Sequence, residues 1–145
     1  MTRNLIVIGC AALLAFGLSF GSFAGSSPDS DSDGVPDAFD NCTATANGPL
    51  LATGSCNAQE DYDAVPDGYG QPCDSDVNND GFNGLDDVNI MLSQLGGIQA
   101  STGNLDCDAL GTGLNDVNTA LGLLGGAPGP SGLSCAGTGS PCTAQ

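Results

Sequence analysis

The distribution of charge constrains this chain more than any other feature of its sequence. Its 145 residues carry 17 aspartate and glutamate side chains, a single basic residue, Arg3, and no histidine. All the acids except Glu60 and Asp61 lie in four short windows, residues 29–40, 63–74, 76–87 and 106–116. Carboxylates this close together repel one another, and the chain has almost no cationic side chain to pair with them. Divalent cations are therefore the expected counter-charge, and binding to the phosphates of nucleic acids is excluded.

The third window, residues 76–87, has the spacing of a metal-binding loop. Counted from Asp76, oxygen-bearing side chains fall at positions 1, 3 and 5, Gly81 falls at position 6 and an aspartate closes at position 12. This is the spacing of an EF-hand-type calcium loop, in which glycine permits a sharp turn and position 7 offers a backbone carbonyl. Hard oxygen donors without histidine or thiolate favour calcium over zinc or copper. The alternative is an Asx-rich surface turn without an ion. The predicted ligands are Asp76, Asn78, Asp80, the Phe82 carbonyl and Asp87.

A short amphipathic helix is expected after this window, and the loop-helix unit is repeated. Residues 84–97 align without gaps with residues 113–126. Neither helix is long enough to form alone, so the repeat predicts a paired loop-helix module with Leu92 and Leu121 at the centre of its helix contact. The apolar stripes, at the spacing of one helical face, are Val88, Met91, Leu92 and Leu95 in the first unit and Val117, Ala120, Leu121 and Leu124 in the second.

The window before the second helix admits two registers. Counting from Asp106 keeps a glycine at the turn but places Leu110 at position 5. Counting from Asn104 closes a full-length loop at Asn115 but places Ala109 at the turn. The first register is favoured because alanine would be strained there. Its predicted ligands are Asp106, Asp108 and Asp116.

The first two windows differ in the completeness of their ligand sets. In the second, Val65 at position 3 cannot bind a metal and Gln71 at position 9 is a weaker neutral donor. The predicted ligands of the first window are Asp29, Asp31, Asp33, the Val35 carbonyl, Asp37 and Asp40. Those of the second are Asp63, Asp67, the Tyr69 carbonyl and Asp74. Together the windows predict about two to four bound calcium ions.

The N-terminus is expected to direct export. A short basic segment precedes an apolar run over residues 5–20, and small residues around Ala24 fit a cleavage site, so residues 1–24 are predicted to be a signal peptide. A permanent membrane span is the alternative, although the run is short and interrupted by glycines. A lipoprotein box ending at Cys10 is a further alternative. The prediction is a secreted, extracellular protein, with attachment to the cell surface left open.

The cysteine count agrees with export to an oxidising compartment. Cleavage after Ala24 removes Cys10, and an even number of cysteines then remains, which predicts three disulfides. Their pairing is open, although the spacing of Cys135 and Cys142 favours a local bridge. The aromatic content is low, so the core is expected to need metals and disulfides for stability. The remaining cysteines are Cys42, Cys56, Cys73 and Cys107.

These features predict a small, irregular fold that is mainly loop, with a few short α-helices held by disulfides. Residues 25–75 form an acidic calcium-loop region, within which 43–58 is interpreted as a surface insertion. Residues 76–126 form the paired loop-helix module. Residues 127–145, rich in proline, glycine and serine, are either a flexible end or a segment for sorting or attachment.

Residues 29–42, DSDSDGVPDAFDNC, resemble the thrombospondin type 3 repeat at every acidic position, at the glycine and at the terminal Asn-Cys. Residues 59–74 resemble the partner half of that repeat. The resemblance implies calcium binding in both windows. It also implies a disulfide between Cys42 and Cys73, beside the local pair Cys135–Cys142, which leaves Cys56 for Cys107.

Residues 76–126 resemble a dockerin type I or other EF-hand-like tandem, which implies a small helical module with two calcium loops. Position 9 of the third window is Gly84 instead of the usual asparagine. The repeat also lacks the basic residues that dockerins usually present to their cohesin partners, which weakens the inference of cohesin binding.

An enzyme is not expected. The pair Asp86–Asp87 could serve acid-base chemistry, but loop closure and capping of the helix already account for it. The expected function is that of a secreted, calcium-binding structural or adhesive protein. The alternative is a dockerin-like docking module that presents its helices to an extracellular or cell-surface protein of cohesin type.

Overall fold

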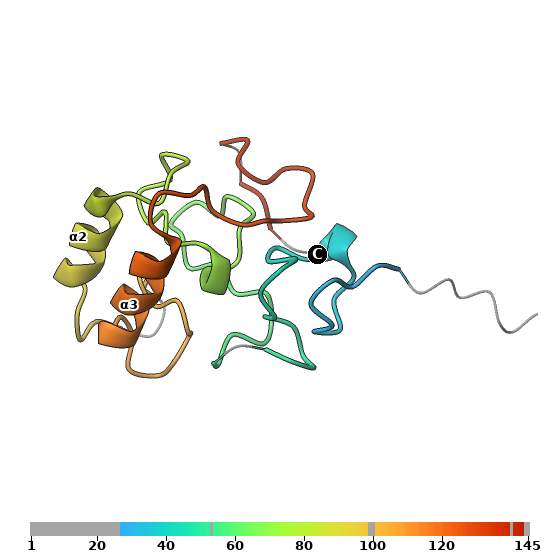
Figure 1. Cartoon of the computed structure of the whole chain (residues 1–145), viewed down its shortest axis with the longest axis horizontal. Helices are drawn as coiled ribbons and strands as arrows, with labels where there is room; N and C mark the ends of the chain where they lie inside the picture. Colours follow the sequence, from blue (N-terminus) through green and yellow to red (C-terminus); the bar gives the residue numbers. More distant parts are fainter. Residues whose placement is uncertain (1–26, 53, 99–100, 140, 144–145) are drawn as a thin grey trace, which may run out of the picture.

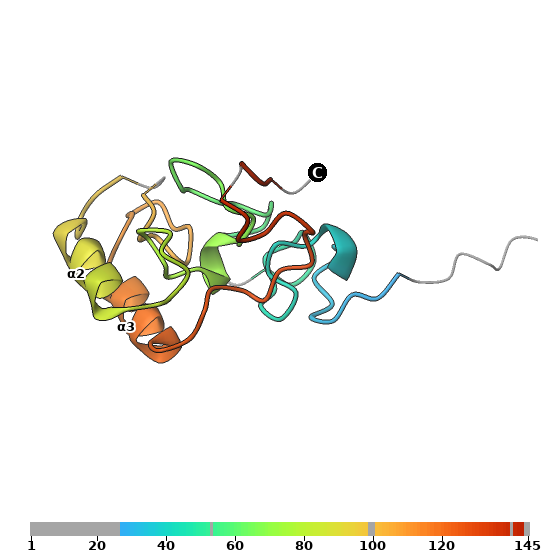
Figure 2. The ribbon, with the colours of Figure 1, turned by 90° about the horizontal axis from the view of Figure 1, so that it is seen from above.

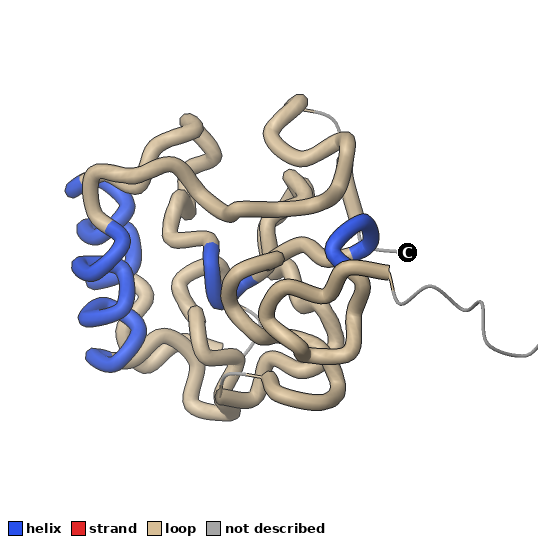
Figure 3. The backbone as a smooth tube through the Cα atoms, turned by 45° about the vertical axis from the view of Figure 1, so that its right-hand side comes forward, coloured by secondary structure: helices blue, strands red, loops and turns tan. Residues whose placement is uncertain are grey.

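The computed structural model describes residues 27–52, 54–98, 101–139 and 141–143. The predicted signal peptide lies outside these ranges. Two single-turn 3-10 helices, η1 (Asp37–Phe39) and η2 (Gln71–Cys73), precede two α-helices, α2 (Leu85–Ser93) and α3 (Leu114–Leu123). The rest of the described chain is loop (Figure 3). It contains one isolated β-bridge, between Asp67 and Cys142, and the described residues form no β-strand. The prediction of a small fold that is mainly loop with a few short helices is confirmed.

The helices α2 and α3 lie side by side at one end of the molecule (Figures 1 and 2). Each begins with the same contact, because the carboxylate of its third residue accepts the N–H of the glycine before the helix. The distance is 2.7 Å for both Asp87 with Gly84 and Asp116 with Gly113. Such contacts satisfy amide groups that a helix start leaves unpaired. The repeat therefore produces two helices that begin alike.

A small apolar core fills the space between the two units. Its centre is Met91, which is fully buried, and Val77 packs against its edge. The core therefore draws on the loops as well as on the helices. Its buried members are Val88, Met91, Leu105, Val117 and Ala120.

The prediction that Leu92 and Leu121 are buried at the centre of the helix contact is wrong. These side chains are 44% and 48% exposed, and Leu95 and Leu124 are also exposed. Leu105, the residue before the fourth window, occupies part of the core. Each helix therefore buries only the narrower edge that includes its valine. The other half of each predicted stripe faces solvent.

Two equivalent backbone hydrogen bonds join the two loop-helix units at their ends. The N–H of Gly125, after α3, donates to the carbonyl of Asn83, before α2, at 2.9 Å. The N–H of Gly96, after α2, donates to the carbonyl of Thr112, before α3, at 3.0 Å. Each pair has the same place in its unit, so the halves are held by matching bonds.

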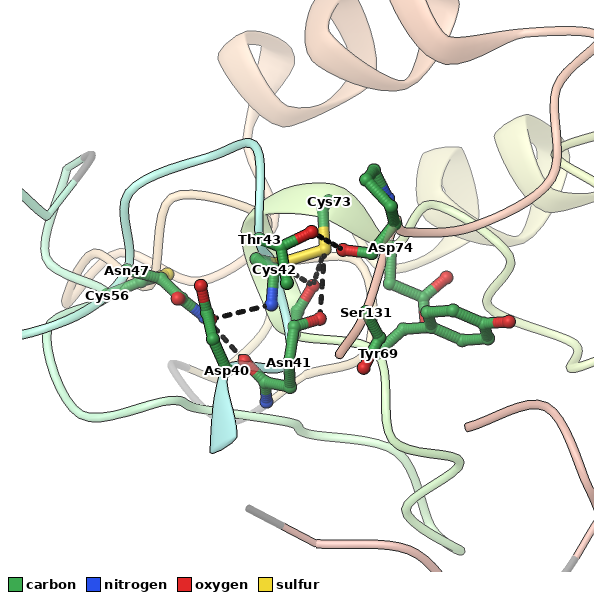
Figure 4. Close-up of a disulfide and its surroundings, with 12 residues drawn as sticks. Asp40, Asn41, Cys42, Thr43, Asn47, Cys56, Tyr69, Cys73, Asp74 and Ser131 are labelled. Atoms are coloured by element: carbon green, nitrogen blue, oxygen red, sulfur yellow. Dashed lines mark hydrogen bonds between the residues drawn. A yellow bond between two sulfur atoms is a disulfide. The ribbon is translucent and has the colours of Figure 1, made fainter. Parts of the chain in front are cut away.

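The N-terminal region has a different interior, made of amide side chains. Asn41 and Asn47 are buried, and the Asn47 Nδ2 donates to the Asn41 Oδ1 at 2.7 Å. Gln59 connects both, accepting the Asn41 N–H at 2.7 Å and donating from Nε2 to the Asn47 Oδ1 at 2.5 Å. Figure 4 shows Asn41 and Asn47 beside the Cys42–Cys73 disulfide. Because Asn47 belongs to segment 43–58, that segment is part of the interior and not only a surface insertion.

Three disulfides cross-link the described residues. They join Cys42 to Cys73, Cys56 to Cys107 and Cys135 to Cys142. This is the pairing that the family resemblance implied, and the prediction of three disulfides is confirmed. The second bridge connects segment 43–58 with the fourth window, so it ties the N-terminal region to the helix pair.

The C-terminal segment, defined here as residues 127–139 and 141–143, is packed and not a free end. It crosses from α3 to the N-terminal region (Figure 1, orange to red). Backbone bonds attach it there, such as the Gly129 N–H to the Cys73 carbonyl at 3.0 Å. In the described part of the chain, no helix has the length and apolar character that crossing a membrane requires.

Candidate metal-binding loops

All four windows contain the same backbone turn. In each, the N–H of the residue at position 7 donates to the Oδ1 of the aspartate at position 5, with the fourth window counted from Asn104. In the first three, the glycine between them has a left-handed backbone, with φ of 96° at Gly34, 93° at Gly68 and 90° at Gly81. A side chain would be strained in that conformation. The donor–acceptor pairs are Val35–Asp33 at 2.8 Å, Tyr69–Asp67 at 3.0 Å, Phe82–Asp80 at 3.1 Å and Leu110–Asp108 at 2.8 Å.

The first and second windows also match at their ends. Each has a single 3-10 turn immediately before its closing aspartate, η1 before Asp40 and η2 before Asp74. Each closing carboxylate accepts the N–H two residues later at 2.9 Å, from Cys42 in one case and Asp76 in the other. The two halves predicted from the type 3-like pattern therefore share one backbone course.

The first window gathers carboxylate oxygens that lack partners. Asp29, Asp31 and Asp33 each place an oxygen within 4.8 Å of the others. The buried atoms Asp29 Oδ1, Asp31 Oδ2 and Asp40 Oδ2 accept no hydrogen bond. Asp40 is fully buried, and burial raises its pKa, with the charges of Asp33 and Asp31 adding to the effect. Desolvation likewise raises the pKa of Asp31. Buried oxygens of this kind require a proton or a cation, so the residues present fit a hard metal ion.

One predicted ligand of the first window is engaged elsewhere. Both carboxylate oxygens of Asp37 are held by Ser30, one by its N–H at 2.7 Å and the other by its hydroxyl at 2.8 Å. Asp33 also uses both oxygens, accepting the N–H of Val35 on Oδ1 and that of Asn47 on Oδ2, the latter at 2.8 Å. The structure thus brings together the aspartates at positions 1, 3 and 5, Asp29, Asp31 and Asp33, and binds Asp37 to Ser30 instead.

The second window forms another cluster. Oxygens of Asp63, Asp67 and Asp74 lie within 4.8 Å of one another. Desolvation raises the pKa of Asp63 to about 7 and that of Asp74 to about 9, and neighbouring aspartates add to both shifts. Burial also raises the pKa of Asp67. Three carboxyls that resist ionisation in the absence of an ion are typical of a place where a cation would bind.

Asp61 lies next to the second cluster, and the window count missed it. It accepts the Asp63 N–H at 3.1 Å, and the buried atoms Asp61 Oδ2 and Asp63 Oδ2 lack partners. Desolvation raises its pKa, and the charge of Asp67 contributes to the shift. The Asp-x-Asp spacing of Asp61 and Asp63, the same as that of Asp31 and Asp33, was the signal that could have identified it.

In the third window the carboxylates turn toward the loop's own backbone. Asp76 accepts the N–H groups of Asp80 at 3.0 Å and Gly81 at 2.6 Å. Asp87 accepts the Asn78 N–H at 3.2 Å besides that of Gly84. Burial raises the pKa of both Asp76 and Asp87. Among the described residues, carboxylate clusters within 4.8 Å occur in the first two windows and not in this one or the fourth.

The fourth window follows neither predicted register completely. The Cys107 N–H bonds to the Asn104 carbonyl at 3.3 Å, as Asn79 bonds to Asp76 at 3.1 Å in the third window. The residues at the turn also match, with φ of 54° at Cys107 and 56° at Asn79. The loop therefore starts at Asn104, as in the disfavoured register.

The end of the fourth window matches the favoured register. Asp116 accepts the N–H groups of Asp106 at 3.1 Å and Gly113, as Asp87 accepts those of Asn78 and Gly84. Burial raises the pKa of Asp116. The loop is thus one residue longer than the third window. Gly111 was matched with the wrong residue, because its left-handed φ of 72° serves the approach to the Ile98 carbonyl and not the tight turn.

A cavity of about 560 Å³ lies between the second window, the third window and the C-terminal segment. Asp67 and Tyr69 line one side, and Asp76 and Asp80 line another. Another acid-containing group, formed by Glu60 with Cys56 and Cys107, is different because its cysteines form a disulfide. It is therefore not a thiolate metal site.

No protein-family model, curated protein or solved structure matches this chain.

Proposed function

We propose that this chain is a calcium-binding structural or adhesive protein of the cell exterior, whose acidic loops are ordered by the ion. The observation that supports this most directly is the set of partnerless buried oxygens in the first window, on Asp29, Asp31 and Asp40. A buried carboxylate without a donor is costly unless a proton or cation neutralises it. The described residues include no basic side chain that could do so.

Calcium is the best candidate for the cation. The donors are carboxylate and carbonyl oxygens on turns, and calcium accepts such flexible oxygen cages more readily than magnesium does. The first and second windows are the best candidate sites, because among the described residues only they bring three carboxylate oxygens within 4.8 Å of one another. Calcium would neutralise the aspartates and fix the loops around it.

The remaining features fit an extracellular structural role. Three disulfides are typical of proteins that fold in oxidising compartments. The carboxylates are accounted for by turn geometry, helix starts and the candidate metal clusters. Nothing in this arrangement requires a catalytic assignment, and we propose none.

Calorimetry on the secreted protein tests the proposal. Calcium should bind with dissociation constants of about 10⁻⁴–10⁻³ M, as in other extracellular modules. Asp40→Asn should weaken the tightest site, because it removes a buried charge. The exposed Asp86→Asn is the matched control and should leave that site unchanged. If millimolar calcium gives no binding heat and a chelator leaves the melting curve unchanged, the proposal is wrong.

A specific observation favours a second candidate function, that of a docking module. The two helices expose leucines at equivalent places, and a contiguous exposed apolar face is typical of an interaction site. A cohesin-type partner could cover this face. Leu92→Asp combined with Leu121→Asp should then abolish capture by that partner and leave calcium binding intact. The exposed pairs are Leu85 and Leu114, Leu92 and Leu121, and Leu95 and Leu124.

A further inference from the structure

The C-terminal segment contacts the first two windows through their main chains. It runs over the N-terminal region in both views of the ribbon (Figures 1 and 2). Figure 4 shows Ser131 of this segment near Tyr69 and Asp74, beside the Cys42–Cys73 disulfide. The segment therefore lies where both windows meet.

At the first window, the segment binds the closing residue. The Gly132 N–H donates to the carbonyl of Asp40 at 2.9 Å. Next to it, the Pro130 carbonyl accepts the Thr43 N–H at 3.0 Å. A Cβ atom on Gly132 would overlap the Asp37 carbonyl oxygen, so only glycine fits against the loop. The position of Asp40 thus depends on a residue more than ninety positions away in the sequence.

At the second window, the segment binds the turn. The Gly137 N–H donates to the carbonyl of Asp67 at 2.9 Å, and the Ser131 hydroxyl donates to the carbonyl of Gly68 at 2.7 Å. The Sγ of Cys142 lies 2.5 Å from the place where Gly68 would carry a Cβ. The Cys135–Cys142 disulfide therefore packs directly on the glycine at the tight turn.

We propose that the C-terminal segment is a positioning element for the calcium sites of the first two windows. It holds the main chain of one ligand residue in each, Asp40 and Asp67, through Gly132 and Gly137. Outer hydrogen bonds that orient metal ligands contribute strongly to affinity. The proposal rests on calcium binding as the proposed function and adds to it residues that touch no ion.

A glycine substitution tests the contact at the first window. Gly132→Ala in the full secreted chain should weaken the tightest calcium site by about tenfold or more in calorimetry. Gly122→Ala is the matched control, because a Cβ there meets no atom within 4 Å. The control should bind calcium as the wild type does.

A second variant tests the contact at the second window with a spectroscopic readout. Terbium(III) replaces calcium, and its emission is excited through tyrosine. The two tyrosines are Tyr62, next to the second window, and Tyr69, within it, and Tyr69 also shares a cavity with Asp76 and Asp80 of the third window, so this emission reports ions bound at the second window and beside that cavity. Cys135→Ser with Cys142→Ser should move the emission midpoint to about tenfold higher terbium concentration. The helical circular dichroism of α2 and α3 should not change.

The outcomes separate this proposal from the proposed function. If the wild type binds neither calcium nor terbium, calcium binding itself is wrong. If the wild type binds and both variants bind equally tightly, the positioning role is overturned and calcium binding stands. Loss of affinity that accompanies loss of the helical signal, in the cysteine variant as in Gly132→Ala, would show general unfolding and would also overturn the positioning role.

Discussion

The third and fourth windows, which precede the helices, and the first two windows contain similar turns but pack on different kinds of interior. Under α2 and α3, apolar side chains such as Met91 and Leu105 form the interior. Under the first window, the interior is a set of hydrogen-bonded amides including Asn41 and Asn47, closed by the Cys42–Cys73 bridge. An apolar core is stable over a wide range of conditions, whereas buried carboxylates and amides depend on every partner being present. The N-terminal region should therefore be the part that responds to disulfides, ions and pH.

The strongest test of this difference is removal of the Cys42–Cys73 bridge by two serine substitutions. A bridge across 31 residues should contribute on the order of 3–4 kcal/mol, mainly by restricting the unfolded chain. Chemical denaturation at saturating calcium measures the loss.

The Cys135→Ser and Cys142→Ser variant is the control for this experiment. Its bridge spans 7 residues, so the expected loss is smaller, about 2 kcal/mol. Equal losses for the two variants would mean that the N-terminal region does not depend on its own bridge more than on that of the C-terminal segment.

The next expected effect is on the stability of the apolar core between the helices. Met91→Ala should destabilise the protein by about 2–3 kcal/mol, because a fully buried side chain leaves a cavity in a small core. Leu92→Ala is the neighbouring control and should cost less than about 1 kcal/mol, since that side chain is 44% exposed. Thermal unfolding followed at a helical wavelength compares them. A larger effect of Leu92→Ala would restore the stripe expected from the sequence.

A more gradual effect is expected from pH in the calcium-free protein. Burial raises the pKa of Asp63 from 3.8 to about 7 and that of Asp74 from 3.8 to about 9. The folded state therefore holds these protons more tightly than the unfolded state. The stability they contribute is complete below about pH 4 and is lost as the pH rises to about 9.

Melting temperatures measured across this pH range with a chelator check the sign. Asp74→Asn should flatten the upper part of the profile, because its amide does not titrate. Excess calcium should remove most of the loss for the wild type. A calcium-free protein that becomes more stable between pH 5 and pH 8 would contradict the prediction.

The smallest expected effect is on calcium binding by the fourth window, and it tests how that window aligns with the third. The backbone places Asn104 where the third window has Asp76, so Asn104→Ala should weaken calcium binding there by about tenfold, or about 1.4 kcal/mol. Leu110→Asp should have little effect, because Leu110 occupies the place of Phe82. Calorimetry with both variants checks this. The opposite result would favour the register that starts at Asp106.

The local units of this fold could be predicted from the sequence. The spacing of aspartates and glycines identified the turns at Gly34, Gly68 and Gly81, because those features depend on residues a few positions apart. The starts of α2 and α3 followed from the repeat for the same reason. Spacing indicated only the local Cys135–Cys142 bridge, and the other two disulfide pairings came from a family resemblance.

The contacts between units could not be predicted. The bond from Gly132 to Asp40 joins main-chain atoms, which leave no side-chain pattern in the sequence. Asp61 was missed because it precedes the second window, although it accepts a hydrogen bond from Asp63 of that window. In the fourth window, Gly111 was aligned with Gly81 of the third. In the structure, Cys107 has the left-handed backbone that Asn79 has in the third window, and Cys107 also forms a disulfide. The bond from Gly132 and the disulfide of Cys107 are long-range contacts, whereas Asp61 lies only two residues from Asp63 and was missed because of where the window was taken to begin.

The exposed pair at the start of each helix bears on how the duplicated units diverged. In the first unit the Asn78 Nδ2 donates to the Asp86 Oδ2 at 3.0 Å, and in the second the Asn115 Nδ2 donates to the Asp106 Oδ2. The amide and the acid have exchanged places while the bond between them has been kept. An aspartate at both positions would bring together two carboxylates that repel each other, whereas two facing amides could still form a hydrogen bond. Chimeras that transplant a whole loop-helix unit should therefore preserve the pair, whereas a crossover inside the loop that joins Asp106 with Asp86 would place two carboxylates face to face.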